Sequence, residues 1–157
     1  IITCEPFQDG NINLFNKIIE KKINNINLFE GNVLEFLDNL DNLDNLDNIK
    51  IFNEVWVLFP DPWPKKRHNK RRLINSFFLN KIASYMKDNG KLMIASDSTA
   101  YIGCILSNIY HLQSIFKWKN QRYEEWNYEN LDLPRTKFYK KALNSNRNSM
   151  IIKLDKI

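Results

Sequence analysis

The sequence predicts an α/β fold in which helices cover both faces of a mostly parallel sheet. Short runs of apolar and β-branched residues alternate with stretches where apolar residues recur at helical spacing, a pattern typical of such folds. The chain has 157 residues, of which 43% are hydrophobic and 26% are charged, so a sizeable core is expected. This length suits one domain, and we predict a single domain over residues 1–157.

The first part of the chain contains two expected strands and two expected helices. Residues 1–4 and 26–29 are short apolar runs, each followed closely by a Pro or a Gly, and helical spacing lies between them over residues 11–22. A second helix starts at Val33 and runs into four copies of Leu-Asp-Asn at residues 37–48. Because Asp-Asn pairs favour turns and caps, we expect this tract to be a low-complexity linker insertion on the surface, partly helical and without chemistry of its own.

The middle of the chain predicts a strand, a helix and another strand. Residues 54–59 form an almost continuous apolar run, which suits a strand buried on both faces. Apolar spacing from Ile74 to Tyr85 then predicts an amphipathic helix that ends at Asn89-Gly90, its expected C-cap. Residues 91–95 have the composition of a further strand.

The remaining chain predicts one more helix and a closing strand. The helix is expected over residues 100–110, with Asp97, Ser98 or Thr99 as its N-cap. The last third is less regular until the strand expected at residues 150–154.

Polar side chains follow four of the expected strands. They are Glu5, Asn32, Asp61 and Asp97. Ligands of open α/β sheets bind at the carboxyl ends of the strands, so these four residues are candidates for one site. Each of them taken singly is typical of a turn or a cap, but together they indicate a site for a polar cofactor.

One short segment accounts for the basic character of the chain. Residues 65–72 carry six cations and no acid, so a net charge of +5 leaves −1 for the rest. Such local basicity indicates an anionic partner, and we expect phosphates of a nucleic acid. The candidate contacts are Lys66, Arg67, Lys70 and Arg71. The alternative is a solvated helix N-terminus, although cations there oppose the helix dipole.

Other classes of protein are not supported by the sequence. The chain has no run of about eighteen uncharged apolar residues, so no membrane span is expected. Cys4 and Cys104 are the only cysteines, which argues against a disulfide scaffold or a metal site and fits a reducing cytoplasm. The chain begins with Ile-Ile-Thr-Cys, which is neither an initiator Met nor a signal peptide, and we expect a piece of a longer chain.

Two motifs give the sequence a recognisable character. The first is Phe59-Pro60-Asp61-Pro62-Trp63-Pro64-Lys65-Lys66-Arg67-His68-Asn69-Lys70-Arg71-Arg72-Leu73, and the second is Thr136-Lys137-Phe138-Tyr139. The first closely resembles the signature of bacterial tRNA (guanine-N7)-methyltransferases, and the second matches in part the Thr-Lys-Phe-Glu motif of that family. Residues 5–7, 24–26 and 29–31 are similar to the family in order and spacing.

The resemblance implies a Rossmann-like class I fold and a methyl transfer from S-adenosylmethionine to N7 of a guanine in the variable loop of tRNA. It implies that Glu5 binds the ribose of the cofactor, that Asn32 lies near the adenine, where the family usually has Asp, and that Asp61 is catalytic and lies beside the sulfonium. The substrate-binding residues that it implies are Lys65, Asp97, Thr136, Lys137, Phe138 and Tyr139. Tyr139 replaces a Glu of the family.

Several roles stay open at the level of the sequence. Asp61 and Asp97 are both able to accept hydrogen bonds from the N1-H and N2-H edge of guanine. Trp63 is able to stack on a base or to be buried, and His68 is expected to be a hydrogen-bonding loop residue rather than a base. A group of aromatic side chains is able either to stack on unpaired RNA bases or to pack in the protein. These are Tyr123, Trp126 and Tyr128.

The glycine-rich loop of class I methyltransferases has no counterpart here, because Gly10 and Gly31 stand alone. We expect that the first strand, its loop and its helix are missing, and that this chain alone binds S-adenosylmethionine weakly or not at all. The alternative function is a non-catalytic RNA-binding fragment of such an enzyme. An α/β enzyme for small metabolites would explain the polar residues after the strands but not the clustered cations.

Overall fold

The computed structural model of the chain describes residues 1–43, 49–133 and 135–157. These residues form two compact units, Ile1–Ile49 and Lys50–Ile157, and each is described by itself. The single domain over residues 1–157 therefore stays a prediction. Residues 44–48, near the end of the Leu-Asp-Asn tract, lie outside the described residues.

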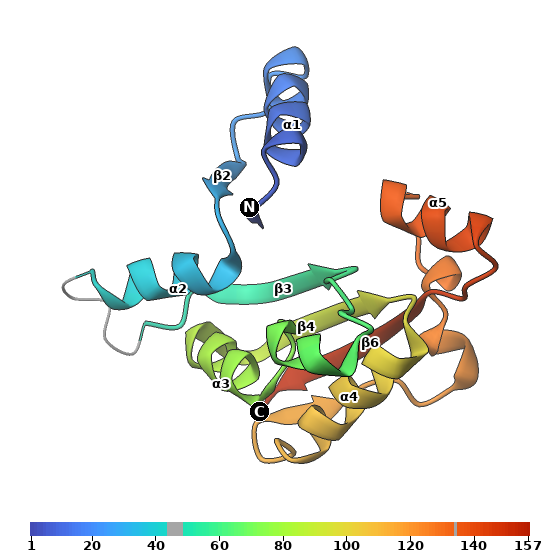
Figure 1. The fold of residues 1–157 in the computed structure, drawn as a ribbon. Coiled ribbons are helices and arrows are strands. Elements are labelled where there is room, and N and C mark those ends of the chain that lie inside the picture. The colour runs from blue at the N-terminus through green and yellow to red at the C-terminus, as the bar shows by residue number, and fades with distance from the viewer. Residues whose placement is uncertain (44–48, 134) are drawn as a thin grey trace. The chain divides into compact units, whose positions relative to one another are not determined.

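The first unit has the strands and helices that the sequence predicts. They are β1 (Ile2–Glu5), α1 (Gln8–Glu20), β2 (Asn27–Glu30) and α2 (Val33–Asp41) (Figure 1). β1 and β2 form a parallel two-stranded sheet in which Glu5 pairs with Glu30, so both strands end at the same edge. Helix α2 includes the first Leu-Asp-Asn copy and buries Leu37 completely. The prediction of a partly helical tract is thus confirmed for residues 37–41.

The second unit contains a four-stranded sheet. Its elements are β3 (Phe52–Leu58), η1 (Lys66–Arg71), α3 (Ser76–Tyr85), β4 (Met86–Ser96), α4 (Thr99–Tyr110), β5 (Phe116–Trp118), η2 (Tyr123–Trp126), η3 (Tyr128–Asn130), α5 (Lys137–Asn144) and β6 (Met150–Lys156). The strand order is β3-β4-β6-β5. β3 and β4 are parallel, whereas β6 is antiparallel to both β4 and β5. The α/β class is confirmed, and β5, with three residues, is too short to have been predicted.

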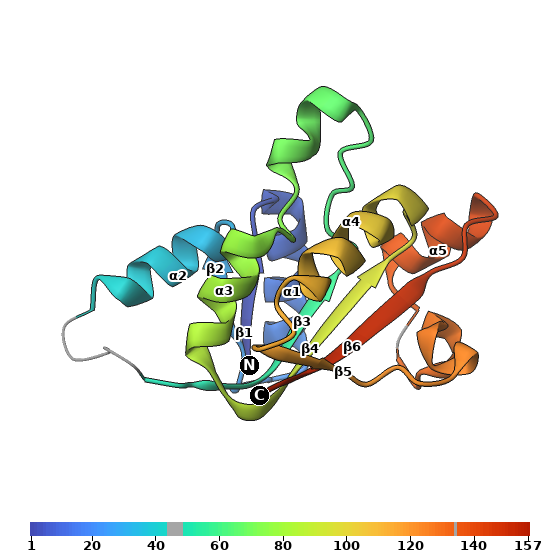
Figure 2. The same ribbon diagram turned by 90° about the horizontal axis from the view of Figure 1, so that it is seen from below.

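Helices α3 and α4 lie on the same face of this sheet (Figure 2) and contact each other. Their apolar sides supply most of the core, together with the buried residues of β4 and β6. The buried residues include Phe78, Leu79, Ile82, Tyr101, Ile105, Ile109, Leu92, Ile94, Ile151 and Ile152. β3 is the edge strand, and its Trp56 and Leu58 remain 39% and 42% exposed, so the prediction that both faces of this strand are buried is wrong.

The predicted end of the middle helix is also wrong. Helix α3 ends at Tyr85, and the next residue, Met86, already has extended backbone and begins β4. Asn89, with φ of 61°, instead lies within an irregular stretch of β4, where the pairing register shifts between Phe52 and Glu54 of β3. The Asn-Gly signal therefore marks a bulge in a strand rather than a helix cap.

Candidate functional site

The carboxyl ends of the parallel strands β3 and β4 lie side by side and form one edge of the sheet in the second unit, the edge at which the strands end. The backbone N–H of Phe59 donates to the carbonyl of Ala95 at 2.8 Å, which aligns the chain after β3 with the end of β4. Ser96 pairs with Met150, so the loop before β6 reaches the same edge. Asp61 and Asp97 therefore follow neighbouring strand ends, as predicted.

Asp61 lies in an exposed loop between β3 and η1. Its carboxylate makes no hydrogen bond and no ion pair with any other described residue. The loop begins and ends at unusual backbone, since Phe59 and Trp63 have φ angles of 52° and 42°. Left-handed backbone at bulky residues costs energy and persists only where the surroundings hold it. Asp61 is thus an unpaired acid on a constrained loop.

The side chain that holds this loop is Arg72. Its Nε donates to the carbonyl of Pro62 at 2.8 Å and one terminal nitrogen donates to that of Trp63 at 3.4 Å. The other terminal nitrogen donates to Sγ of Cys104 at 2.9 Å. Only 7% of Arg72 is exposed. One of the six clustered cations therefore serves the fold, which the sequence did not reveal because all six look alike.

The remaining cations of the segment are exposed. They are Lys65, Lys66, Arg67, Lys70 and Arg71. Most of them lie on η1, which is separate from α3, because α3 begins at Ser76 and is capped by Asn75. These cations are therefore not the N-terminus of α3, whereas their role, as solvated residues or as phosphate contacts, stays a prediction. The basic segment is a surface of its own beside the Asp61 loop.

Trp63 packs against this basic segment and is half-buried. The guanidinium of Arg71 lies 4.9 Å from the centre of its ring, and the His68 ring meets it edge-on at 5.7 Å. Nε2 of His68 also accepts a hydrogen bond from Arg67 at 3.3 Å, as expected of a loop residue. These contacts favour the packing role of Trp63 over stacking on a base.

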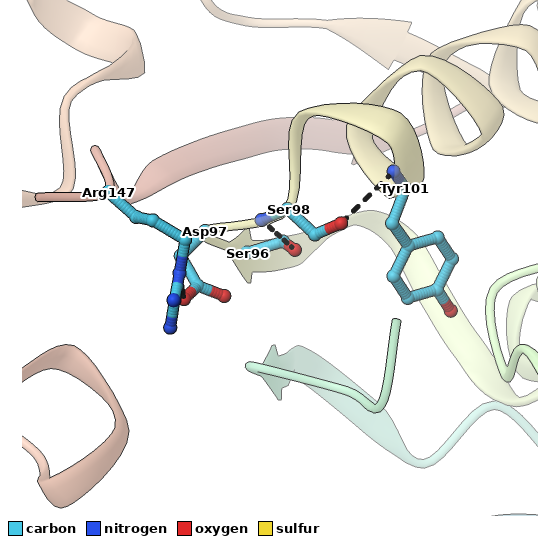
Figure 3. Close-up of polar contacts among 5 residues, drawn as sticks. All are labelled: Ser96, Asp97, Ser98, Tyr101 and Arg147. Atoms are coloured by element: carbon cyan, nitrogen blue, oxygen red, sulfur yellow. Dashed lines mark hydrogen bonds and ion pairs between the residues drawn. The ribbon is translucent and has the colours of Figure 1, made fainter. Parts of the chain in front are cut away.

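Asp97 is paired with a residue that the sequence did not indicate (Figure 3). Nε of Arg147, from the loop between α5 and β6, lies 2.8 Å from Oδ2 of Asp97. Hydrogen bonds also fix the backbone on both sides of Asp97. Oγ of Ser96 accepts from the N–H of Ser98 at 3.2 Å, and Ser98 caps α4. Arg147 is fifty positions away in sequence, so no local pattern connects it to Asp97.

The second motif reaches the Asp61 loop through an aromatic contact. Phe138, near the start of α5, stacks on Phe59 with ring centres 6.5 Å apart and ring planes inclined by 20°. Thr136 caps the helix, and its Oγ1 accepts from the N–H of Tyr139 at 3.2 Å. The structure therefore brings Phe138 of the second motif against Phe59 of the first, although the two motifs lie far apart in sequence, and the substrate roles of Thr136 and Lys137 stay predictions.

Tyr139 is a core residue of the second unit. It is 2% exposed, its ring stacks on Tyr128 with centres 5.0 Å apart, and its hydroxyl donates to Glu129. Burial, and then the Glu129 carboxylate, raise the pKa of the Tyr139 phenol above its usual value. The hydroxyl of Tyr139 is therefore already bonded to Glu129 inside the protein, and this disfavours the predicted contact of Tyr139 with the substrate.

The three aromatic residues considered for base stacking differ in how far they are exposed to solvent. Tyr128 is 2% exposed and belongs to the core, so stacking on RNA is wrong for this residue. Trp126 is half-buried and lies 6.0 Å from Trp118. Tyr123 is 84% exposed and is the member of the group that stays a prediction.

Glu5 and Asn32 lie at the carboxyl edge of the sheet in the first unit. Oε1 of Glu5 accepts from the N–H of Phe7 at 2.9 Å, whereas no described residue bonds Oε2. A Cβ at Gly10 would lie 2.9 Å from Cγ of Glu5, so the glycine makes room for this side chain. Oδ1 of Asn32 caps α2 by accepting from Leu34 and Glu35, and its Nδ2 donates to no described residue. A common edge with Asp61 and Asp97 stays a prediction, because those residues belong to the other unit.

The described residues include no helix long and apolar enough to cross a membrane. Within the same ranges, no three His, Cys, Asp or Glu side chains are grouped so that they could hold a metal ion.

The sequence is similar to a known family and to several characterised proteins. The model of a family described as "Putative methyltransferase" matches residues 1–152. A tRNA (guanine-N(7)-)-methyltransferase of Wolbachia pipientis is 33% identical over 156 residues, which are 99% of this chain and 64% of that protein. The enzyme of the same description from Zymomonas mobilis is 33% identical over 141 residues, 90% of this chain and 58% of that protein. The chain thus spans less than two thirds of the length of these relatives.

Solved structures of methyltransferases have a similar fold. An rRNA methylase from Streptococcus thermophilus has a TM-score of 0.59 at 13% identity, covering 99% of this chain and 72% of that one. A protein from Streptococcus mutans described as "a putative methyltransferase" and solved in complex with SAH has a TM-score of 0.58 at 12% identity, covering 99% of this chain and 75% of that one. At this level of identity the similarity concerns the fold.

Proposed function

Because the chain belongs to the methyltransferase family whose model matches residues 1–152, we propose that it transfers a methyl group from S-adenosylmethionine to N7 of a guanine in tRNA. The names of the relatives in Wolbachia and Zymomonas support this substrate. The observation that carries the proposal is the unpaired carboxylate of Asp61, which lies at the edge of the sheet beside an exposed basic segment. A site that modifies RNA requires a group that hydrogen-bonds the edge of the target base and cations that bind the phosphates, and this arrangement supplies both.

The first unit offers polar atoms that suit the nucleoside part of the cofactor. Oε2 of Glu5 is an acceptor for a ribose hydroxyl. Nδ2 of Asn32 is a donor, and it suits a ring nitrogen of adenine rather than the amino group, because Oδ1 is used by the helix cap. When bound, S-adenosylmethionine supplies a methyl group activated by its sulfonium.

The second unit orients the guanine. Its N7 carries a lone pair at neutral pH, so the site needs no strong base and acts chiefly by proximity and orientation. We propose that Asp61 accepts hydrogen bonds from the N1-H and N2-H edge, since Asp97 is already paired with Arg147. Asp97 then has a supporting role. Lys65, Thr136, Lys137 and Phe138 are the further substrate contacts of this proposal.

The exposed cations of η1 are proposed to bind tRNA phosphates. Replacing Lys66, Arg67 and Arg71 together with Ala should weaken tRNA binding irrespective of sequence, because binding to phosphates carries no sequence information. The slope of log affinity against log salt should shrink by about 2–3, because each phosphate that is no longer neutralised lowers it by about 0.7–0.9. Filter-binding titrations at several salt concentrations measure this slope.

The matched control removes the same charge from another part of the second unit. Lys87, Lys91 and Lys117 are exposed and lie on strands rather than near the Asp61 loop, so their replacement with Ala should leave the slope unchanged. An equal decrease of the slope in both triple variants would mean that net charge alone matters, and the proposed binding of phosphates by η1 would then be wrong.

A further inference from the structure

Helix α5 concentrates positive charge at the surface of the second unit. Three of its eight residues are the exposed lysines Lys137, Lys140 and Lys141, and the helix contains no acid. None of the three makes an ion pair with another described residue. Two other lysines of this unit do form ion pairs, since Lys50 bonds Asp88 and Lys119 bonds Asp155. The charge of α5 is therefore not balanced within the described protein.

The arrangement of these lysines works against the helix. Lys137 lies three and four residues before Lys140 and Lys141, so all three share one side of α5. Like charges at these spacings repel one another and destabilise a helix. The helix dipole favours Lys141 in the last turn but opposes Lys137 in the first. Helix stability alone does not explain three cations here, whereas an anionic ligand would relieve their repulsion.

The lysines line an open recess of about 560 Å³. Its other lining residues are Asn144 and Ser145, which carry an amide and a hydroxyl, and no acid contributes to it. All five side chains are able to donate hydrogen bonds. The polar ends of these side chains are donors of the kind that phosphate oxygens require, whereas most of the recess surface is formed by their apolar parts.

The recess is connected to the candidate site through its own helix. Phe138 stacks on Phe59, two residues before Asp61. In Figure 2, α5 and the green segment around η1 project from different parts of the second unit. The second unit thus carries exposed cations on two elements, η1, which follows the Asp61 loop, and α5, whose Phe138 contacts the end of β3.

From these observations we infer that α5 is a second phosphate-binding surface for tRNA, formed by Lys137, Lys140 and Lys141 and distinct from η1. This inference rests on the proposed function and deepens it. Lys140 and Lys141 act here by binding the RNA backbone and have no part in the chemistry.

The test is the double variant Lys140→Ala, Lys141→Ala, compared with wild type and with Lys87→Ala, Lys91→Ala, which removes two exposed lysines of β4. Alanine keeps the helix, because it has the highest helix propensity. All variants are made in the protein as its gene encodes it. Binding of a tRNA transcript is measured between low and physiological salt, and methyl transfer is measured on the same samples. The slope of log affinity against log salt should shrink by about 1.4–1.8 in the α5 variant and stay unchanged in the control.

The outcomes separate this inference from the proposed function. Unchanged binding and slope in the α5 variant, with normal tRNA binding by wild type, would overturn the inference and leave the function intact. Wild-type binding without methyl transfer would overturn the function, while a reduced slope in the α5 variant would still support the RNA surface. Absence of tRNA binding by wild type would overturn both.

Discussion

In the protein restored to full length, Asp61→Asn is expected to lower kcat/KM for methylation of tRNA by roughly 10- to 150-fold, which corresponds to about 1.5–3 kcal/mol. The substitution keeps the size of the side chain but turns one acceptor oxygen into a donor that faces N1-H and N2-H of guanine. The charge-assisted hydrogen bond between the carboxylate and guanine is lost, and the new amide donor faces the N–H donors of the base. Affinity for tRNA should hardly change, because phosphates carry most of it. Methylation kinetics, tRNA binding and a melting curve on the same preparation measure the three quantities.

The fold should tolerate this change, because Asp61 is exposed and makes no bond to another described residue. Near-normal turnover would remove Asp61 from the mechanism and leave Asp97 as the guanine acceptor. A collapsed melting curve would instead make Asp61 a structural residue. Asp97→Asn is the matched comparison, and it should weaken the pair with Arg147 as well as any hydrogen bond to the substrate.

Arg72→Ala is expected to destabilise the second unit by about 2–4 kcal/mol. The substitution removes the donors to the carbonyls of Pro62 and Trp63 and the interaction of the guanidinium with the Tyr101 ring, 5.2 Å away. The strained backbone of the Asp61 loop is then without the side chain that holds it. Urea titration monitored by tryptophan fluorescence measures the shift of the unfolding midpoint.

The neighbouring Arg71 is the control for this prediction. It has the same charge and side chain, but it is exposed, and the ring of Trp63 is its partner among the described residues. Arg71→Ala should therefore change stability by less than about 1 kcal/mol. Equal destabilisation by the two variants would contradict the loop-holding role of Arg72.

The α/β fold was predictable because its elements are specified by local patterns. The spacing of apolar residues and the positions of turn residues predicted helices α1 and α4 and strands β1, β2, β3 and β6 to within a few residues. The errors arose where tertiary structure decides. Asn89-Gly90 has the chemistry of a helix cap, but buried Met86 already belongs to β4, so the pair became part of a bulge.

The site was predictable at the level of motifs but not of partners. The sequence identified Asp61 and the residues around Thr136, and their proximity follows from the stacking of Phe138 on Phe59. It did not identify Arg147 as the partner of Asp97, since ion pairs across fifty residues leave no local signal. It also did not separate buried Arg72 from exposed Arg71, because charge patterns say nothing of side-chain direction.

The most direct measurement is the position of the methyl group on the product. The protein as its gene encodes it is incubated with S-adenosylmethionine labelled in the methyl group and with a tRNA transcript, and the RNA is digested to nucleosides. We expect the label in N7-methylguanosine, and we expect no transfer to a transcript in which 7-deazaguanine, which lacks the N7 lone pair, replaces the target guanine. Label on any other nucleoside, or equal transfer to the 7-deazaguanine transcript, would contradict methylation of guanine N7 by this site.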